Sequence, residues 1–130
     1  MMLEINTDGA CSGNPGKRGL GVVISERGKI IKRISEPAGF GTNNEAEYLA
    51  VIRALEEAHL LHADSLRITS DSKLIVMQLK GKYKIKSEGL KKLKAKADSL
   101  IKKFKSVEFI WAEREGNFSA DALAKTASMR

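Results

Sequence analysis

The sequence has few of the features that mark secreted or membrane proteins. Cys11 is the only cysteine among 130 residues, so no internal disulfide can form and nothing calls for an oxidising compartment. No apolar run approaches the roughly 18 residues that span a bilayer, and the N-terminus lacks the pattern of a signal peptide. Aromatic residues make up only 5% of the chain, so the core must be mainly aliphatic. These absences predict a cytoplasmic protein that does not enter a membrane.

Apolar periodicity and turn residues predict alternating strands and helices in a single domain of residues 1–130. Strands are predicted around Ile5 and over 20–25, 30–35, 66–70 and 107–112, and helices over 43–59, 73–79, 90–104 and around Asp121. The segment 9–21, rich in glycine, is predicted to be a loop, and Trp111 is predicted to lie in the core. The order β-β-β-α-β-α-α-β-α favours an α/β fold in which helices flank one sheet.

Positive charge is concentrated in one segment of the chain. The net charge is +7, and the eleven lysines between Lys80 and Lys105 are accompanied only by Glu88 and Asp98, which gives this segment +9. A basic segment beside an acidic site favours a polyanionic substrate such as a nucleic acid. The alternative is that these lysines form an ordinary solvated helix surface.

Four acidic residues stand in short motifs far apart along the chain. They are Asp8 in Thr7-Asp8-Gly9-Ala10, Glu47 in Thr42-Asn43-Asn44-Glu45-Ala46-Glu47, Asp71 in Ser70-Asp71-Ser72, and Asp121 in Ser119-Ala120-Asp121-Ala122-Leu123-Ala124. Asp8 and Asp71 are each predicted to end a strand, where ligands of α/β sheets gather. Clustered carboxylates repel one another unless cations neutralise them, and hard oxygen ligands suit Mg²⁺ or Mn²⁺. Each acid alone has an ordinary alternative, such as a helix cap for Asp71. Together they predict a divalent-metal site.

These motifs, in this order, resemble those of type 1 ribonuclease H. The segments that carry the resemblance are Asp8-Gly9-Ala10-Cys11-Ser12-Gly13-Asn14-Pro15-Gly16 and the three motifs around Glu47, Asp71 and Asp121. The resemblance runs over residues 3–127 and implies a ribonuclease H-like fold with a mixed five-stranded sheet. It further implies an endonuclease that hydrolyses the RNA strand of RNA–DNA hybrids and leaves 3′-hydroxyl and 5′-phosphate ends.

The resemblance also implies roles for individual residues. Asp8, Glu47, Asp71 and Asp121 match the metal-binding carboxylates, with Asp8 bridging two Mg²⁺ ions, or Mn²⁺ in their place. One ion would activate the attacking water, and the other would stabilise the departing 3′ oxygen. Contacts to the hybrid are implied for Gly9, Cys11, Ser12, Asn14, Thr42, Asn43 and Asn44. Within this set, Thr42 would hold a DNA phosphate, and Cys11 is expected to be a small packed residue and not a catalytic thiol. The alternative for the glycine segment is a plain turn.

The chain departs from the family pattern in two places. Many members carry a histidine on the loop before the last acidic ligand, whereas residues 111–117 contain none. Arg114 could replace it electrostatically but not as a base, and Glu115 is a further candidate. A basic insertion of larger members is also missing, because only residues 81–89 stand in its place. Lys82, Lys84 and Lys86 in that connection are predicted to contact the DNA strand.

Two other functions are compatible with the same fold. One is a catalytically silent module that binds RNA–DNA hybrids, and the other is a nuclease of DNA junctions. The complete set of carboxylates argues against the first, and the motif from Thr42 to Glu47 together with the glycine segment argues against the second. We expect a monomer.

Overall fold

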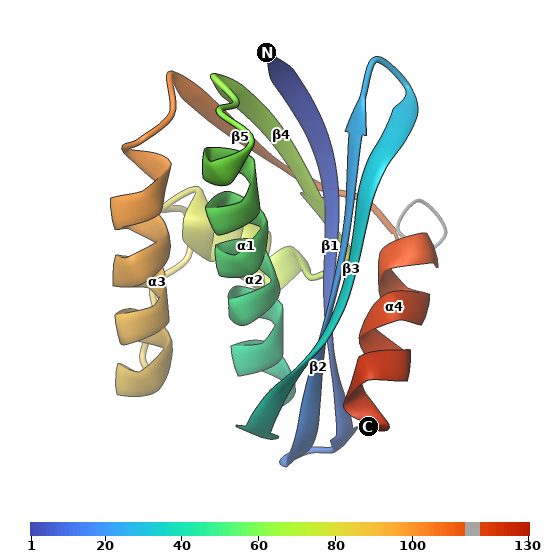
Figure 1. The fold of residues 1–130 in the computed structure, drawn as a ribbon. Helices are drawn as coiled ribbons and strands as arrows, with labels where there is room; N and C mark the ends of the chain where they lie inside the picture. The colour runs from blue at the N-terminus through green and yellow to red at the C-terminus, as the bar shows by residue number, and fades with distance from the viewer. Residues whose placement is uncertain (114–117) are drawn as a thin grey trace.

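The structure, a computed structural model, describes residues 1–113 and 118–130 (Figure 1). Its elements are β1 (Met2–Gly13), β2 (Gly16–Glu26), β3 (Lys29–Gly41), α1 (Asn43–Leu60), β4 (Ser65–Ser70), α2 (Lys73–Leu79), α3 (Glu88–Ile101), β5 (Ser106–Trp111) and α4 (Phe118–Ser128). This order confirms the predicted succession of strands and helices. In the part of the chain that the structure describes, no helix combines the length and apolar character needed to cross a membrane.

The five strands form one mixed sheet in the order β3-β2-β1-β4-β5. β1, β2 and β3 are antiparallel neighbours, whereas β4 runs parallel to both β1 and β5. The last register pair of β1 and β4 joins Thr7 to Ser70. The residue that follows each of these in the chain is an acid, so this register brings Asp8 and Asp71 close together.

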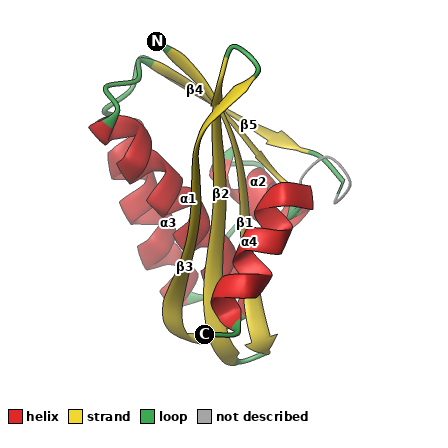
Figure 2. Ribbon diagram, turned by 45° about the vertical axis from the view of Figure 1, so that its right-hand side comes forward, coloured by secondary structure: helices red, strands yellow, loops and turns green. Residues whose placement is uncertain are grey.

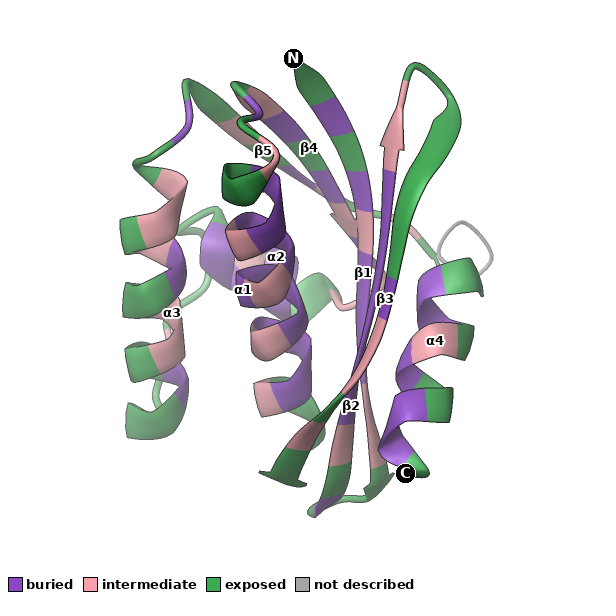
Figure 3. Ribbon diagram, viewed as in Figure 1, coloured by how far each residue is buried: buried purple, intermediate pink, exposed green. Residues whose placement is uncertain are grey.

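Helices cover both faces of the sheet, with α1, α2 and α3 on one face and α4 on the other (Figure 2). The main core lies under the three helices and is aliphatic, as the low aromatic content predicts. Its fully buried members include Leu3, Ile5, Val51, Leu55 and Ile68. Figure 3 shows this burial along the inner sides of α1 and along β1 and β4. From these two layers, α1 and α4 pack against β1 from opposite sides.

The prediction of a loop over residues 9–21 was wrong, because this segment forms a β-hairpin. β1 continues to Gly13 and β2 begins at Gly16, and β2 and β3 likewise extend beyond the predicted 20–25 and 30–35. The glycines allow helix α4 to lie directly on β2. A Cβ atom on Gly21 would lie 2.0 Å from the Ala120 carbonyl oxygen of α4. Glycine at this position therefore permits the backbone of α4 to pack closely on the backbone of β2, and it does not mark a turn.

The prediction that Trp111 lies in the core was also wrong, since 45% of this residue is exposed. Trp111 is the last residue of β5, which is an edge strand with only β4 beside it. Phe109, two residues earlier, is buried. The hydrophobic side chain at the strand end therefore lies at the surface, close to the bend that follows β4.

Candidate active site

Three of the acidic residues converge where β4 ends. Asp8 comes from β1, Glu47 from the first turns of α1, and Asp71 from the bend after β4. One carboxylate oxygen of each lies within 4.8 Å of those of the other two. Oxygen atoms at this spacing can share a divalent cation, because Mg²⁺ and Ca²⁺ sites are built from carboxylates of this kind.

Glycine at position 9 allows α1 to approach β1 closely enough for Glu47 to reach Asp8. The Gly9 N–H donates a 2.6 Å hydrogen bond to Glu47 Oε1. A Cβ atom at this position would lie 2.2 Å from the Ala46 carbonyl carbon. Because side chains alternate along a strand, Gly9 faces α1 while Asp8 points toward the face that α4 covers. The prediction that Asp8 ends a strand was wrong, because β1 continues beyond it to Gly13.

The start of α1, which fixes the position of Glu47, is held by a capping box. Thr42 Oγ1 accepts the Glu45 N–H at 3.2 Å, and Glu45 Oε1 accepts the Thr42 N–H at 2.7 Å. This reciprocal arrangement satisfies two backbone donors of the first turn. Glu47 lies two residues further along the helix and is only 6% exposed, so it is held rigidly against the sheet.

Asp121 reaches the same site from the opposite face of the sheet. It lies on α4, is 8% exposed, and lines with the other three acids a cavity of about 200 Å³. Its carboxyl group lies within hydrogen-bonding reach of Asp8. Its Oδ2 atom is 3.2 Å from the Lys125 ammonium group, one turn further along the helix. The four acids thus come from β1, α1, α4 and the bend after β4.

The packing of these acids changes how readily they ionise. The pKa of Asp8 is raised to about 10, first by burial and then by the charge of Glu47, the hydrogen bond with Asp121 and the charge of Asp71. Burial also raises the pKa of Glu47 to about 7, although the hydrogen bond from Gly9 acts in the opposite direction. Both groups therefore hold a proton more readily than a free carboxyl group does, and a bound cation would favour their ionised forms. This donor set therefore fits a divalent metal ion.

Four of the residues expected to contact a hybrid line one cavity beside the carboxylates. Asn14 Oδ1, at the hairpin tip, accepts the Asn43 N–H at 3.1 Å and so joins the hairpin to the start of α1. A cavity of about 400 Å³ is lined by Asn14, Thr42, Asn43, Asn44, Glu45, Ser87 and Leu90. Asn43 also lines the carboxylate cavity, so the two hollows adjoin.

Other residues with an expected role lie in different settings. Cys11 is half-buried, lines the carboxylate cavity and donates its thiol to the Gly41 carbonyl oxygen at 3.1 Å, whereas Ser12 is exposed. Lys82, Lys84 and Lys86 are all exposed in the connection between α2 and α3, which contains neither helix nor strand. Arg114 and Glu115 lie outside the described residues.

Two residues of the carboxylate cavity were missed by reasoning from the sequence. Lys125 and Ser128 line it with Asp121. Their spacing of four and seven residues from Asp121 places them on the same face of a helix, which was the available signal. A third neighbour is Trp111, whose indole N–H donates to the Asp71 carbonyl oxygen at 3.2 Å. No sequence pattern indicated that contact.

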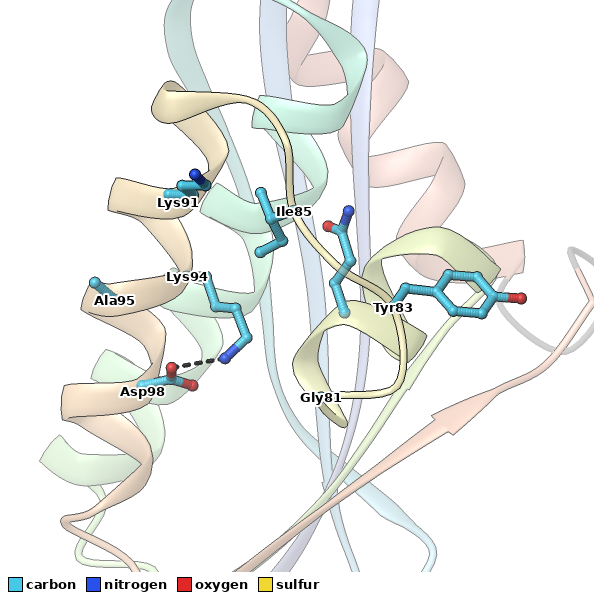
Figure 4. Close-up of a pocket in the computed structure, with 8 residues that line it drawn as sticks. Gly81, Tyr83, Ile85, Lys91, Lys94, Ala95 and Asp98 are labelled. Carbon is cyan, nitrogen blue, oxygen red and sulfur yellow. Dashed lines mark hydrogen bonds and ion pairs between the residues drawn. The ribbon is translucent and has the colours of Figure 1, made fainter.

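A separate cavity of about 280 Å³ lies between α2 and α3 (Figure 4). Its polar lining includes Lys91 and Lys94, but both are paired with acids. The Lys94 ammonium is 2.8 Å from Asp98, and the Lys91 ammonium is 3.2 Å from Glu88. The positive charges that line this cavity are therefore already compensated by acids.

Comparisons with known proteins agree on one family. The family model described as "Reverse transcriptase-like" matches residues 6–127. A bifunctional protein of Mycobacterium tuberculosis is 36% identical over 98% of this chain, and the chain spans 35% of that protein's length. A ribonuclease HI of Halobacterium salinarum is 36% identical over 92% of this chain and 61% of its own length.

Solved structures give the same result. A ribonuclease H of Halobacterium salinarum superposes with a TM-score of 0.95 at 34% identity, covering 98% of this chain and 97% of that one. A second ribonuclease H, isolated from compost and solved in complex with an RNA/DNA hybrid, has a TM-score of 0.92 at 37% identity, covering 98% and 96%.

Proposed function

This chain belongs to the type 1 ribonuclease H family, and on that premise we propose that it hydrolyses the RNA strand of RNA–DNA hybrids. The observation that carries the proposal is the convergence of four acids, each from a different element, on one cavity beside the groove of Asn14, Thr42, Asn43 and Asn44. A solved relative binds an RNA/DNA hybrid. Because this chain spans only about a third of the mycobacterial relatives, the proposal concerns this domain alone.

Asp8, Glu47, Asp71 and Asp121 would hold two Mg²⁺ ions, or Mn²⁺ in their place. When bound, such ions would supply an activated water and neutralise charge on the departing oxygen, and the expected products carry 3′-hydroxyl and 5′-phosphate ends. Asp8 is the candidate for the bridging ligand, because it lies next to Glu47, Asp71 and Asp121. Asp8 lies in the middle of β1, and the Gly9 N–H donates a hydrogen bond to Glu47. Both features keep these ligands in fixed positions.

Recognition of the hybrid would fall to the groove beside the metal ligands. Glycine-containing backbone at 9–16 and the amides of Asn14, Asn43 and Asn44 would approach the minor groove. Cys11 and Ser12 would make further contacts, and Thr42 would hold a DNA phosphate. The 2′-hydroxyl is the group that distinguishes RNA from DNA there. Arg114 would contribute positive charge near the cleaved phosphate. One chain supplies all four acids, so a monomer is expected to suffice.

Incubation with strand-labelled duplexes tests the proposal directly. RNA–DNA, RNA–RNA and DNA–DNA duplexes are treated with the purified protein in Mg²⁺, Mn²⁺ or EDTA. We expect cleavage of only the RNA strand of the hybrid, and only with metal. Binding without cleavage would support a silent hybrid-binding module instead. Cleavage of DNA would support a nuclease of DNA junctions.

Replacing Lys82, Lys84 and Lys86 together with methionine should weaken hybrid binding without lowering the cleavage rate of bound substrate. All three side chains are exposed, and none of them lines the carboxylate cavity. Each phosphate contact contributes about 0.9 to the slope of log affinity against log salt, so the slope should flatten by up to about 3. Affinity is measured between about 50 and 200 mM salt, the range in which such effects are large. An unchanged slope would identify these lysines as solvated surface. Lys102, Lys103 and Lys105 provide a control triple of equal charge.

A further inference from the structure

Trp111 contacts the backbone of a proposed metal ligand. Its indole N–H donates to the Asp71 carbonyl oxygen at 3.2 Å, and the Lys73 ammonium lies 5.5 Å from the centre of its ring. The side chain is 45% exposed, so its place is not explained by burial in the core. A cation over the face of an indole is attracted by the ring electrons and limits the ring's rotation.

Asp71 is the proposed ligand in the least regular setting. Asp8, Glu47 and Asp121 lie within a strand or a helix, whereas Asp71 lies in the bend between β4 and α2 and is half-buried. The residues on either side are held: Ser70 Oγ accepts the Ser72 N–H at 3.1 Å, and the Ala112 N–H donates to the Ser70 carbonyl oxygen at 3.1 Å.

The indole continues the β4–β5 ladder by one step. The last register pair of these strands is Ser70 with Trp111, and the Asp71 carbonyl lies just beyond it. The side chain of Trp111 provides the donor for that carbonyl. A hydrogen bond there restrains the peptide unit that follows Asp71, and with it the direction in which the carboxylate projects.

We propose that Trp111 is a positioning residue that orients Asp71 for metal binding. The inference rests on the proposed function, because it requires that the carboxylates hold a divalent cation. Groups that orient metal ligands typically alter metal affinity by about 10- to 100-fold when they are removed. Because Trp111 acts through the backbone, we expect an effect at the lower end of that range, about 10-fold.

The test compares Trp111→Phe with Phe109→Leu. The first variant keeps an aromatic ring and removes the N–H donor. The second lies in the same strand and destabilises the core, since Phe109 is only 7% exposed, but it leaves the Trp111 contact intact. Calorimetric titration with Mn²⁺ alone should show about 10-fold weaker binding for Trp111→Phe and unchanged binding for Phe109→Leu. Thermal denaturation confirms that both variants are folded.

Two further readouts separate positioning from general damage. The Mg²⁺ concentration for half-maximal cleavage should rise by the same factor in Trp111→Phe, whereas KM for the hybrid at saturating Mg²⁺ should not change. Trp111 is also the only tryptophan, so Mn²⁺ should quench the emission of the unaltered protein with the midpoint that calorimetry gives.

Each alternative outcome identifies what has failed. Equal Mn²⁺ affinity in Trp111→Phe and the unaltered protein overturns the positioning role. Equal weakening in both variants also overturns it, because loss of stability alone would then explain the effect. If the unaltered protein binds no Mn²⁺ and cleaves no hybrid, the proposed function fails and this inference fails with it.

Discussion

Replacing Asp8 with asparagine is expected to abolish metal-dependent cleavage and, without metal, to stabilise the protein. The substitution keeps the shape of the side chain but removes the charge at the centre of the four acids. Loss of the charge stabilisation that bound metals supply, several kcal/mol, corresponds to a fall in rate of about a thousand-fold or more. Cleavage of strand-labelled hybrid at saturating Mg²⁺ measures this effect.

The stabilising effect should depend on pH. Asp8 ionises near 3.8 as a free side chain, but its pKa is raised to about 10 in the folded chain by burial and then by Glu47. The folded state therefore binds more protons than the unfolded state between these values, and metal-free stability falls as pH rises. An asparagine side chain cannot ionise, so Asp8→Asn should exceed the unaltered protein in stability at about pH 8 and match it near pH 4.

Thermal denaturation in EDTA and in Mg²⁺ measures the stability of the variant and of the unaltered protein without and with metal. Mg²⁺ should stabilise the unaltered protein more than the variant, because only a cation that binds the folded state shifts the equilibrium. Lys125→Met serves as a comparison variant for Asp8→Asn. It removes a charge that lines the same cavity while all four acids remain. Full cleavage activity in Asp8→Asn would rule out the proposed metal role.

Replacing Gly21 with alanine should damage both stability and catalysis through helix α4. The added Cβ would lie 2.0 Å from the Ala120 carbonyl oxygen and 2.7 Å from the Ala124 nitrogen, which are backbone atoms that cannot rotate away. Overpacking of this kind costs about 3 kcal/mol when the helix must shift. Asp121 follows Ala120 directly, so the shift also displaces a proposed ligand. A displacement of about 1 Å lowers turnover about 100-fold.

Gly89→Ala is the matched control for this prediction. Gly89 lies in the first turn of α3, where the nearest atom to an added Cβ would be Ser87 Oγ at 3.7 Å. Alanine should therefore stabilise the helix by about 0.5–1 kcal/mol and leave cleavage unchanged. Urea denaturation and single-turnover cleavage measure both variants. If Gly21→Ala keeps its stability and rate, close packing of α4 on β2 is not what positions Asp121.

Local patterns in the sequence predicted which helices and strands exist better than they predicted the residues at which these begin and end. The apolar spacing of residues 43–59 gave α1 almost to the residue, and the helix of residues 73–79 begins and ends as predicted. The hairpin was missed because Gly13, Gly16, Gly19 and Gly21 are typical of turns. In the fold they sit in or beside strands, where α4 and a tight hairpin require them.

The sequence by itself predicted the four acids of the proposed site and determined the order in which the elements follow, because motifs and periodicity are local properties of a chain. Only the tertiary structure decided that Asp8 and Asp71 are neighbours, since this depends on the register of β1 with β4. It also decided that Asp121 arrives from the opposite face and that Trp111 reaches the Asp71 carbonyl. Such contacts join residues 40 or more positions apart. They depend on the order of strands in the sheet and on the face that each helix covers, which no short segment specifies.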